Sequence, residues 1–200
     1  MRNFFKQFLK DKFAIISSFV LLILYSAIFL ANFIAPYPKD FSDRKLSYAP
    51  PSNVYFITPE GKLSRPYTYN YIRKFDKNSL RMYFVQDRSQ KYYLTLFPEG
   101  FEYKFLGIFK TKRHLFGVEK GGNIFLLGCD INGRDNFSRL LYGGQVSLTI
   151  GFLALFISFP IGLIYGGIAG YLGGITDMLM MRLAEAVMSI PSFYLLIILA

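Results

Sequence analysis

The sequence predicts an α-helical multi-pass membrane protein that carries a small, β-containing domain outside the membrane. Two stretches without any charged residue support the membrane part, Phe13–Ala35 with 23 residues and Leu140–Thr176 with 37. The charged residues lie mainly between these stretches, among many Tyr and Phe residues that favour strands. Only 18% of the chain is charged, whereas soluble domains average about 25%.

A first membrane span is expected at residues 13–35. A hydrocarbon core about 30 Å thick needs roughly 20 apolar residues in a helix, so this stretch is long enough. It is also longer than the apolar region of a cleaved signal peptide, about 7–15 residues, which favours an uncleaved anchor. Basic residues in the segment 1–12 place the N-terminus in the cytoplasm, and Pro36 ends the helix on the other side.

Residues 36–144 are expected to form an extracytoplasmic region, with a partly β domain over about 50–113. Three strands are predicted, at Val54–Thr58, Tyr83–Val85 and Tyr92–Phe97. Three turns are predicted, at Pro59-Glu60-Gly61, Asp87-Arg88-Ser89-Gln90 and Pro98-Glu99-Gly100. A domain of roughly 60 residues is marginal on its own, so we expect it to depend on the membrane part.

Residues 145–200 are expected to hold two further spans, helices at about 146–170 and 178–200. Pro160 should kink the first of these helices, and Asp177 can cap the second. A helix that stops inside a bilayer leaves carbonyl groups unpaired. We therefore expect the sequence to be a piece of a longer, C-terminally truncated protein.

Glycines recur at every fourth position near the end of the second predicted span, at Gly162, Gly166, Gly170 and Gly174. On a helix they would share nearly one face. Small residues on such a face let another helix approach closely. The alternative is a chance excess, because glycine is common in membrane helices.

The net charge of +10 would suit nucleic acid, but no compact basic cluster or binding motif appears. We therefore expect no nucleic-acid partner and attribute the charge to membrane topology. The sequence lacks a phosphate-binding loop, H-E-x-x-H, G-x-S-x-G and any Cys/His cluster. It predicts no catalytic residue, no metal site and no cofactor, and structural roles for Cys129 and His114.

Charged residues flank the second predicted span. Gly133 allows a tight turn, Arg134 and Asp135 should begin the helix, and Asp135 can pair with Arg139 four residues on. A structural role for this group is favoured over direct contact with a partner protein.

A second pair of charged residues, Arg182 and Glu185, lies near the start of the third predicted span. Ionisable groups at membrane depth are functional candidates, so Arg182, Glu185 and the nearby Pro191 are candidates for a gate or transport pathway. A local ion pair that serves structure alone is the other interpretation.

The run from His114 to Pro191 resembles the oligopeptide/dipeptide permease C family, the second membrane subunit of bacterial peptide-type ABC importers. The family pattern G-T-D-x-x-G-R-D, then S-R-L-x-Y-G, is matched at Gly128, Asp130, Gly133, Arg134, Asp135, Ser138, Arg139, Leu140, Tyr142 and Gly143, with Cys129 in place of Thr. The later pattern G-Y-x-G-G-x-x-D is matched at Gly170, Tyr171, Gly173, Gly174 and Asp177. The resemblance covers about residues 10–38 and 114–200, and residues 50–113 look like an insertion carried by some members.

The resemblance implies a partial type I ABC importer permease fold in a bacterial inner membrane. It implies a heterodimer with a second homologous permease subunit, two cytoplasmic ATPase subunits, and an extracytoplasmic peptide-binding protein. The family's cytoplasmic E-A-A…G docking loop is not found, since Ala184-Glu185-Ala186 lies within a predicted span. The solute is left open among oligopeptides, dipeptides, nickel chelates and glutathione.

The expected function is therefore that of a permease subunit for ATP-driven peptide uptake. The alternative is a membrane-anchored extracytoplasmic interaction module without transport activity, with residues 39–113 as its working part. An enzyme is disfavoured by the missing motifs.

Overall fold

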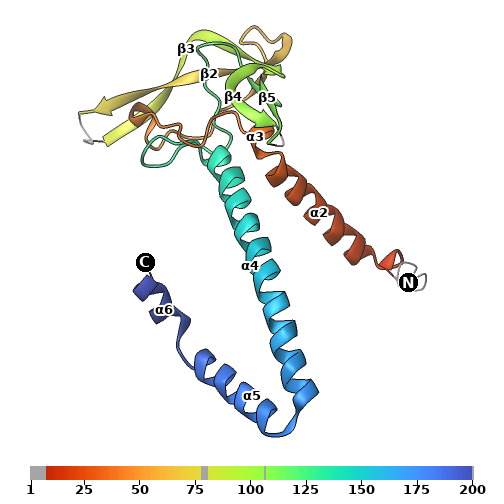
Figure 1. The fold of residues 1–200 in the computed structure, drawn as a ribbon. Coiled ribbons are helices and arrows are strands. Elements are labelled where there is room, and N and C mark those ends of the chain that lie inside the picture. Colours follow the sequence, from red (N-terminus) through yellow and green to blue (C-terminus); the bar gives the residue numbers. More distant parts are fainter. Residues whose placement is uncertain (1–7, 78–80, 106, 200) are drawn as a thin grey trace. The chain divides into compact units, whose positions relative to one another are not determined.

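The computed structural model describes residues 8–77, 81–105 and 107–199, and the chain divides into two compact units, Met1–Val146 and Ser147–Ala200 (Figure 1). The first unit contains α2 (Lys12–Phe29), α3 (Ala31–Ile34), η1 (Arg44–Leu46), β1 (Tyr55–Ile57), β2 (Leu63–Asp76), β3 (Arg81–Leu96), β4 (Glu99–Phe105), β5 (Phe109–Arg113), β6 (Phe116–Val118) and the start of α4 (Asn136–Leu172). The second contains the rest of α4, α5 (Gly174–Met188) and α6 (Ser192–Leu199).

Among the described residues, α2 and α4 are the two helices long and apolar enough to cross a membrane. The carboxylate of Asp11 caps α2, because its Oδ1 accepts the N–H groups of Phe13 (2.9 Å) and Ala14 (3.3 Å). No residue of α2 is buried within the chain, so its apolar side chains are free to face lipid. After a break at Leu30, α3 follows and ends before the first proline.

The β domain contains a four-stranded antiparallel sheet in the order β1-β2-β3-β6 and a separate β4–β5 hairpin. The predicted turn after β1 is confirmed: the N–H of Gly61 donates to the carbonyl of Thr58 (2.9 Å), and Gly61 has a φ of +79°. Tyrosine rings hold the sheet together, with Tyr67 stacked on Tyr55 at 5.6 Å between ring centres.

The turn predicted at residues 87–90 is wrong, because β3 runs unbroken from Arg81 to Leu96. Both strands predicted on either side of it belong to this one strand. Asp87 pairs with Asn70 of β2 and Tyr92 pairs with Thr68, so residues 88–91 bulge opposite the single residue between them. The N–H of Ser89 donates to Oδ1 of Asp87 (3.1 Å), so the polar segment forms a bulge within one strand and not a hairpin turn between two.

The chain reverses after β3 one or two residues earlier than predicted. Phe97 has a φ of +56°, and β4 already begins at Glu99. Gly100 thus lies in a strand and not in a turn.

The long helix α4 begins at Asn136, ten residues before the predicted start at 146, and continues through Pro160. The earlier start follows from a side-chain cap at Asp135, described below. The helix ends at Leu172, where Gly173, with a φ of +59°, separates it from α5.

The third predicted helix, 178–200, is interrupted. α5 ends at Met188 and α6 begins at Ser192, with Pro191 between them. Proline has no N–H to donate and disfavours helix in the residue before it, which explains the break. The predicted cap is also wrong: Gly173 occupies the cap position, and Asp177 lies in the first turn of α5, where a negative charge favours the helix dipole.

Candidate functional site

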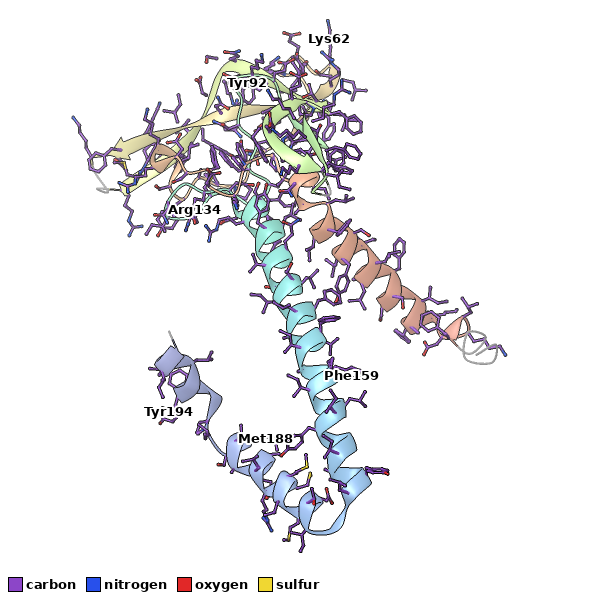
Figure 2. The ribbon with its side chains drawn as sticks, viewed as in Figure 1. Lys62, Tyr92, Arg134, Phe159, Met188 and Tyr194 are labelled. Carbon is purple, nitrogen blue, oxygen red and sulfur yellow. The ribbon has the colours of Figure 1, made fainter. Side chains whose placement is uncertain are left out.

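The family pattern falls on a compact loop, Leu127–Asp135, hereafter the motif loop, which leads directly into α4; Figure 2 labels Arg134 at this point. Asp130 organises the loop. Its Oδ1 accepts the N–H groups of Asn132 (2.8 Å) and Arg134 (3.0 Å). The N–H of Gly133 donates to the carbonyl of Asp130 (2.9 Å), and Gly133 has a φ of +69°. The predicted tight turn at Gly133 is confirmed.

Asp130 also carries the ion pairs of the loop. Its Oδ2 lies 2.8 Å from Nε of Arg134 and 3.9 Å from Nε of Arg139. Partial burial would raise the pKa of Asp130, but hydrogen bonds from Arg134 and Asn132, together with the charge of Arg134, leave the pKa below its ordinary value. Arg139 is therefore directed to Asp130, and the predicted pairing of Arg139 with Asp135 is wrong.

Asp135 caps α4 instead. Its Oδ2 accepts the N–H of Ser138 at 2.8 Å, three residues on, which satisfies one of the free donors at the helix start. The side chain is 2% exposed, so burial raises the pKa of Asp135, although the hydrogen bonds from Ser138 oppose this. Because the Asp135 carboxylate is turned inward to Ser138, it does not also reach Arg139, and the predicted Asp135–Arg139 pair does not form.

The motif loop is fastened to the η1 segment, residues 42–49, by backbone hydrogen bonds. The N–H of Asp43 donates to the carbonyl of Gly133 (3.2 Å), and the N–H of Cys129 donates to that of Ala49 (2.9 Å). A Cβ on Gly133 would collide with the carbonyl oxygen of Asp43. The two segments are 90 residues apart in sequence, so this contact closes the whole β domain between them.

Tyr37 joins the loop region to the end of the first helix. Its hydroxyl accepts the N–H of Ile124 (2.9 Å), and its ring stacks on Phe41 (4.3 Å) and Phe125 (5.2 Å). The N–H of Tyr37 donates to Oγ of Ser138 (3.3 Å). Burial raises the pKa of the Tyr37 hydroxyl, which therefore stays neutral and serves as a fixed connector.

Cys129 and His114 are both buried, 6% and 2% exposed. Burial and the nearby carboxylates raise the pKa of the Cys129 thiol to about 12, so the thiol is neutral and unreactive. The His114 ring lies 4.2 Å from that of Phe101, and its Nε2 is 3.0 Å from the carbonyl oxygen of Phe101. Both residues are packing elements of the β domain and its base.

The four predicted packing glycines do not share one helix. Gly162, Gly166 and Gly170 lie in α4, whereas Gly174 begins α5 with a φ of +56° after the break at Gly173. Within the described residues, nothing lies within 4 Å of a Cβ built on any of the four. The stripe on α4 is thus open, and close helix packing there stays a prediction.

Arg182 and Glu185 form the predicted local ion pair, with Nη1 and Oε2 2.9 Å apart on α5. Both side chains are more than half exposed. Pro191, the third gate candidate, lies at the break between α5 and α6, outside the helix that carries the pair.

Sequence reasoning missed the residues that receive the motif loop: Ser42, Asp43, Ala49 and Tyr37. Ser42 donates its hydroxyl to the carbonyl of Asn132 (2.8 Å), a contact that no local pattern indicates. The spacing of Asp135 and Ser138 was the one available signal, since a carboxylate three residues before a helical N–H is typical of a cap.

The motif loop is a junction between segments that lie far apart in the sequence. Across residues 8–77, 81–105 and 107–199, no group of three or more His, Cys, Asp or Glu side chains could hold a metal ion. The arrangement fixes where the first helix, the β domain and α4 meet, and it presents the partly exposed Arg134 and Arg139 outward.

Comparison with known proteins finds a family match for the N-terminal part of the chain. Residues 1–51 match the family model described as the N-terminal TM domain of oligopeptide transport permease C. These residues contain α2, α3 and the η1 segment that receives the motif loop. No solved structure matches the chain at a significant level.

Curated relatives carry the same description. The chain is 50% identical over 72 residues to the oligopeptide transport system permease protein OppC of Haemophilus influenzae, which is 36% of this chain and 23% of the relative. It is 49% identical over 71 residues to the dipeptide transport system permease protein DppC of Bacillus subtilis, 36% of this chain and 22% of the relative. It is 40% identical over 80 residues to DppC of Haemophilus influenzae, 40% of this chain and 27% of the relative.

The matched part thus spans about a quarter of the length of these relatives. The family description names a transmembrane domain, and the relatives are named as permease proteins of peptide transport systems. These matches confirm the predicted resemblance: the chain is a relative of the permease C proteins of oligopeptide and dipeptide transport systems.

Proposed function

We propose that this chain is part of a membrane-spanning permease subunit of an ATP-driven importer that takes up oligopeptides or dipeptides. The observation that carries the proposal is the 50% identity to an oligopeptide permease, together with the match of residues 1–51 to the permease C transmembrane domain. In this arrangement a binding protein outside the membrane delivers the peptide, and two cytoplasmic ATPase subunits drive transport.

The proposed topology starts with a cytoplasmic N-terminus in a bacterial inner membrane. The basic N-terminal segment, residues 1–12, stays on the cytoplasmic side, and α2 crosses outward. The β domain lies outside, α4 returns to the cytoplasm, and α5 begins the next crossing. An α-helix pairs most of its N–H and C=O groups internally, as a lipid environment requires, although Pro160 in α4 has no N–H to donate.

The proposed partner of the open glycine stripe on α4 is the second permease subunit. Gly162, Gly166 and Gly170 leave free space at the helix surface within the described residues, and small residues at such spacing permit close helix contact.

Arg182 and Glu185 are proposed to stand near the transport pathway. Their pairing lowers the cost of holding two charges beside the membrane.

Uptake by cells tests the proposal. A strain in which the gene for the intact protein is deleted should lose accumulation of a labelled dipeptide and tetrapeptide, and the same gene on a plasmid should restore it. Labelled free amino acids, which use other carriers, serve as the control. Unchanged peptide uptake in the deletion strain would contradict the permease proposal and favour the anchored interaction module.

A further inference from the structure

The far half of the β2–β3 pair is a two-stranded ribbon that projects beyond the rest of the sheet (Figure 1). β1 pairs with β2 only at Leu63–Tyr67, and β6 pairs with β3 only at Leu94–Leu96. Within the described residues, the segments 70–76 and 81–87 therefore pair only with each other. One face of the ribbon is supported near its base, because Phe84 packs against the core that contains Leu46 and Phe125, and the hydroxyl of Tyr71 donates to the carbonyl of Pro51 (2.9 Å).

A groove of about 590 Å³ lies between this ribbon and η1. Its apolar lining includes Leu46, Phe75 and Met82, and its charged lining residues are Arg44, Lys45 and Arg73. Phe75 and Met82 are 50% and 54% exposed. The lining contains three cations and no carboxylate, so the groove is both apolar and positive.

The charged residues beyond the lining are mixed in sign. Lys74 and Arg81 add two cations on the ribbon and Asp76 and Asp87 add two carboxylates, while Lys77 follows the ribbon and Asp43 precedes η1. The Asp43 carboxylate is turned to the backbone of η1, where it accepts the N–H of Lys45 (3.0 Å). Guanidinium and ammonium groups bind phosphate oxygens, and exposed apolar side chains beside them suit the boundary between headgroups and acyl chains.

The groove belongs to the end of the first unit where the two candidate spans meet. Ala31 and Ala35, at the outer end of the first helix, pack on Leu141 in α4. Just before α4, Gly133 bonds to Asp43, the residue that precedes η1. If α2 and α4 cross the membrane, the groove lies within a few residues of their outer boundary, in reach of the headgroup layer.

We propose that this groove and the exposed side of the ribbon bind anionic phospholipid headgroups on the outer surface of the membrane. Phosphate groups pair with Arg44, Lys45 and Arg73, while Phe75 and Met82 enter the boundary of the acyl chains. The inference rests on the two helices crossing a membrane and is independent of which solute is carried.

Tryptophan fluorescence tests the proposal, because residues 1–200 contain no Trp and the signal of any Trp elsewhere in the intact protein is subtracted with the parent protein. Phe75→Trp places the reporter in the groove. Phe56→Trp is the matched control, since Phe56 is 57% exposed and lies at the opposite end of the sheet, about 30 Å along the strands. The intact protein is reconstituted in vesicles of phosphatidylcholine or of an equal mixture with phosphatidylglycerol, each with lipids brominated along the acyl chains. Quenching is measured relative to the parent protein.

The proposal predicts at least about twofold stronger quenching at Phe75→Trp than at Phe56→Trp in the anionic vesicles, with the difference reduced by added salt. The further change Arg73→Glu should reduce quenching at Phe75→Trp without affecting the Phe56→Trp protein. Equal quenching at both positions, or quenching that is the same in neutral and anionic vesicles, would overturn the proposal. If Phe75→Trp is shielded from the brominated lipids only when the other importer subunits are present, a protein occupies the groove. That result would also overturn the proposal. Loss of peptide uptake would leave these results unchanged, which separates this proposal from the transport proposal.

Discussion

Nε of Arg134 lies 2.8 Å from Oδ2 of Asp130, four residues earlier, and this pair closes the loop from which the long helix α4 starts. The same Asp130 holds two backbone N–H groups through its other oxygen. One carboxylate thus fixes the turn, and the turn fixes how the helix, the first span and the β domain meet.

Replacing Asp130 with Ala should destabilise the first unit by about 1–3 kcal/mol, because Arg134 and two N–H groups lose their acceptor. Thermal unfolding of the purified protein in detergent measures the effect. Glu102→Ala is the control: its pair with Lys110 is 3.7 Å long and exposed, so removing it should cost less than about 1 kcal/mol. Equal losses in the two variants would show that Asp130 does not organise the loop.

Gly133→Ala should lower the stability of the protein by more than the strain of a positive φ alone would. Gly107→Ala is the matched control, because Gly107 has a similar φ of +76° against +69°, but a Cβ there would meet nothing within 4 Å. The control should lose about 1–2 kcal/mol from backbone strain, and Gly133→Ala should lose clearly more because it pushes Asp43 away. Similar melting temperatures for the two variants would argue against close docking of the η1 segment.

Asp135 should make the protein less stable as pH rises. Its folded-state pKa is raised by burial, so the folded state holds the proton more tightly than the unfolded state does. Stability therefore falls as pH increases from the ordinary carboxyl pKa through the raised value. Asp130, whose folded pKa is lowered, acts oppositely and loses its contribution as pH falls through that lowered value.

The variant Asp135→Asn separates the two effects, since an amide oxygen can still cap the helix but cannot titrate. Melting temperatures recorded from about pH 4 to 7 should depend less on pH in this variant than in the parent protein. An unchanged pH profile would mean that Asp135 does not titrate differently in the folded state.

Gly166→Leu should weaken assembly with the second permease subunit by blocking close approach of a helix. Gly167→Leu is the control, because it adds the same side chain one position on, about 100° around the helix, and is equally open within the described residues. Co-purification of the tagged protein with its partner measures assembly. Normal assembly in Gly166→Leu, or equal loss in both variants, would contradict packing through the glycine stripe.

The two apolar helices and the β character of the middle region follow from local composition, which is why the sequence predicts them. The boundaries of the helices depend on single residues. The cap at Asp135 starts α4 ten residues before the predicted start, and Pro191 divides the last predicted helix. The polar segment 88–91 stays within β3 because Thr68 and Asn70 of β2 pair with the residues on either side of it. Such long-range partners leave no local pattern.

The sequence predicts which residues make up the motif loop, but it does not predict which segments the loop joins. Its resemblance to a known family marks Gly128–Asp135 in the sequence, yet nothing near Asp43 or Ala49 indicates that these backbone groups receive the loop. Likewise, Arg139 lies near Asp130 and not near Asp135, because Asp135 is buried, and the spacing of the residues does not reveal that burial.

Transport by reconstituted vesicles is the measurement that decides whether this protein serves as a peptide permease subunit. The intact protein is placed in vesicles with the co-expressed permease and ATPase subunits, ATP is enclosed on the cytoplasmic side, and the peptide-loaded binding protein is added outside. The account predicts accumulation of labelled peptide that requires both hydrolysable ATP and this protein. Equal accumulation in vesicles assembled without this protein would contradict it.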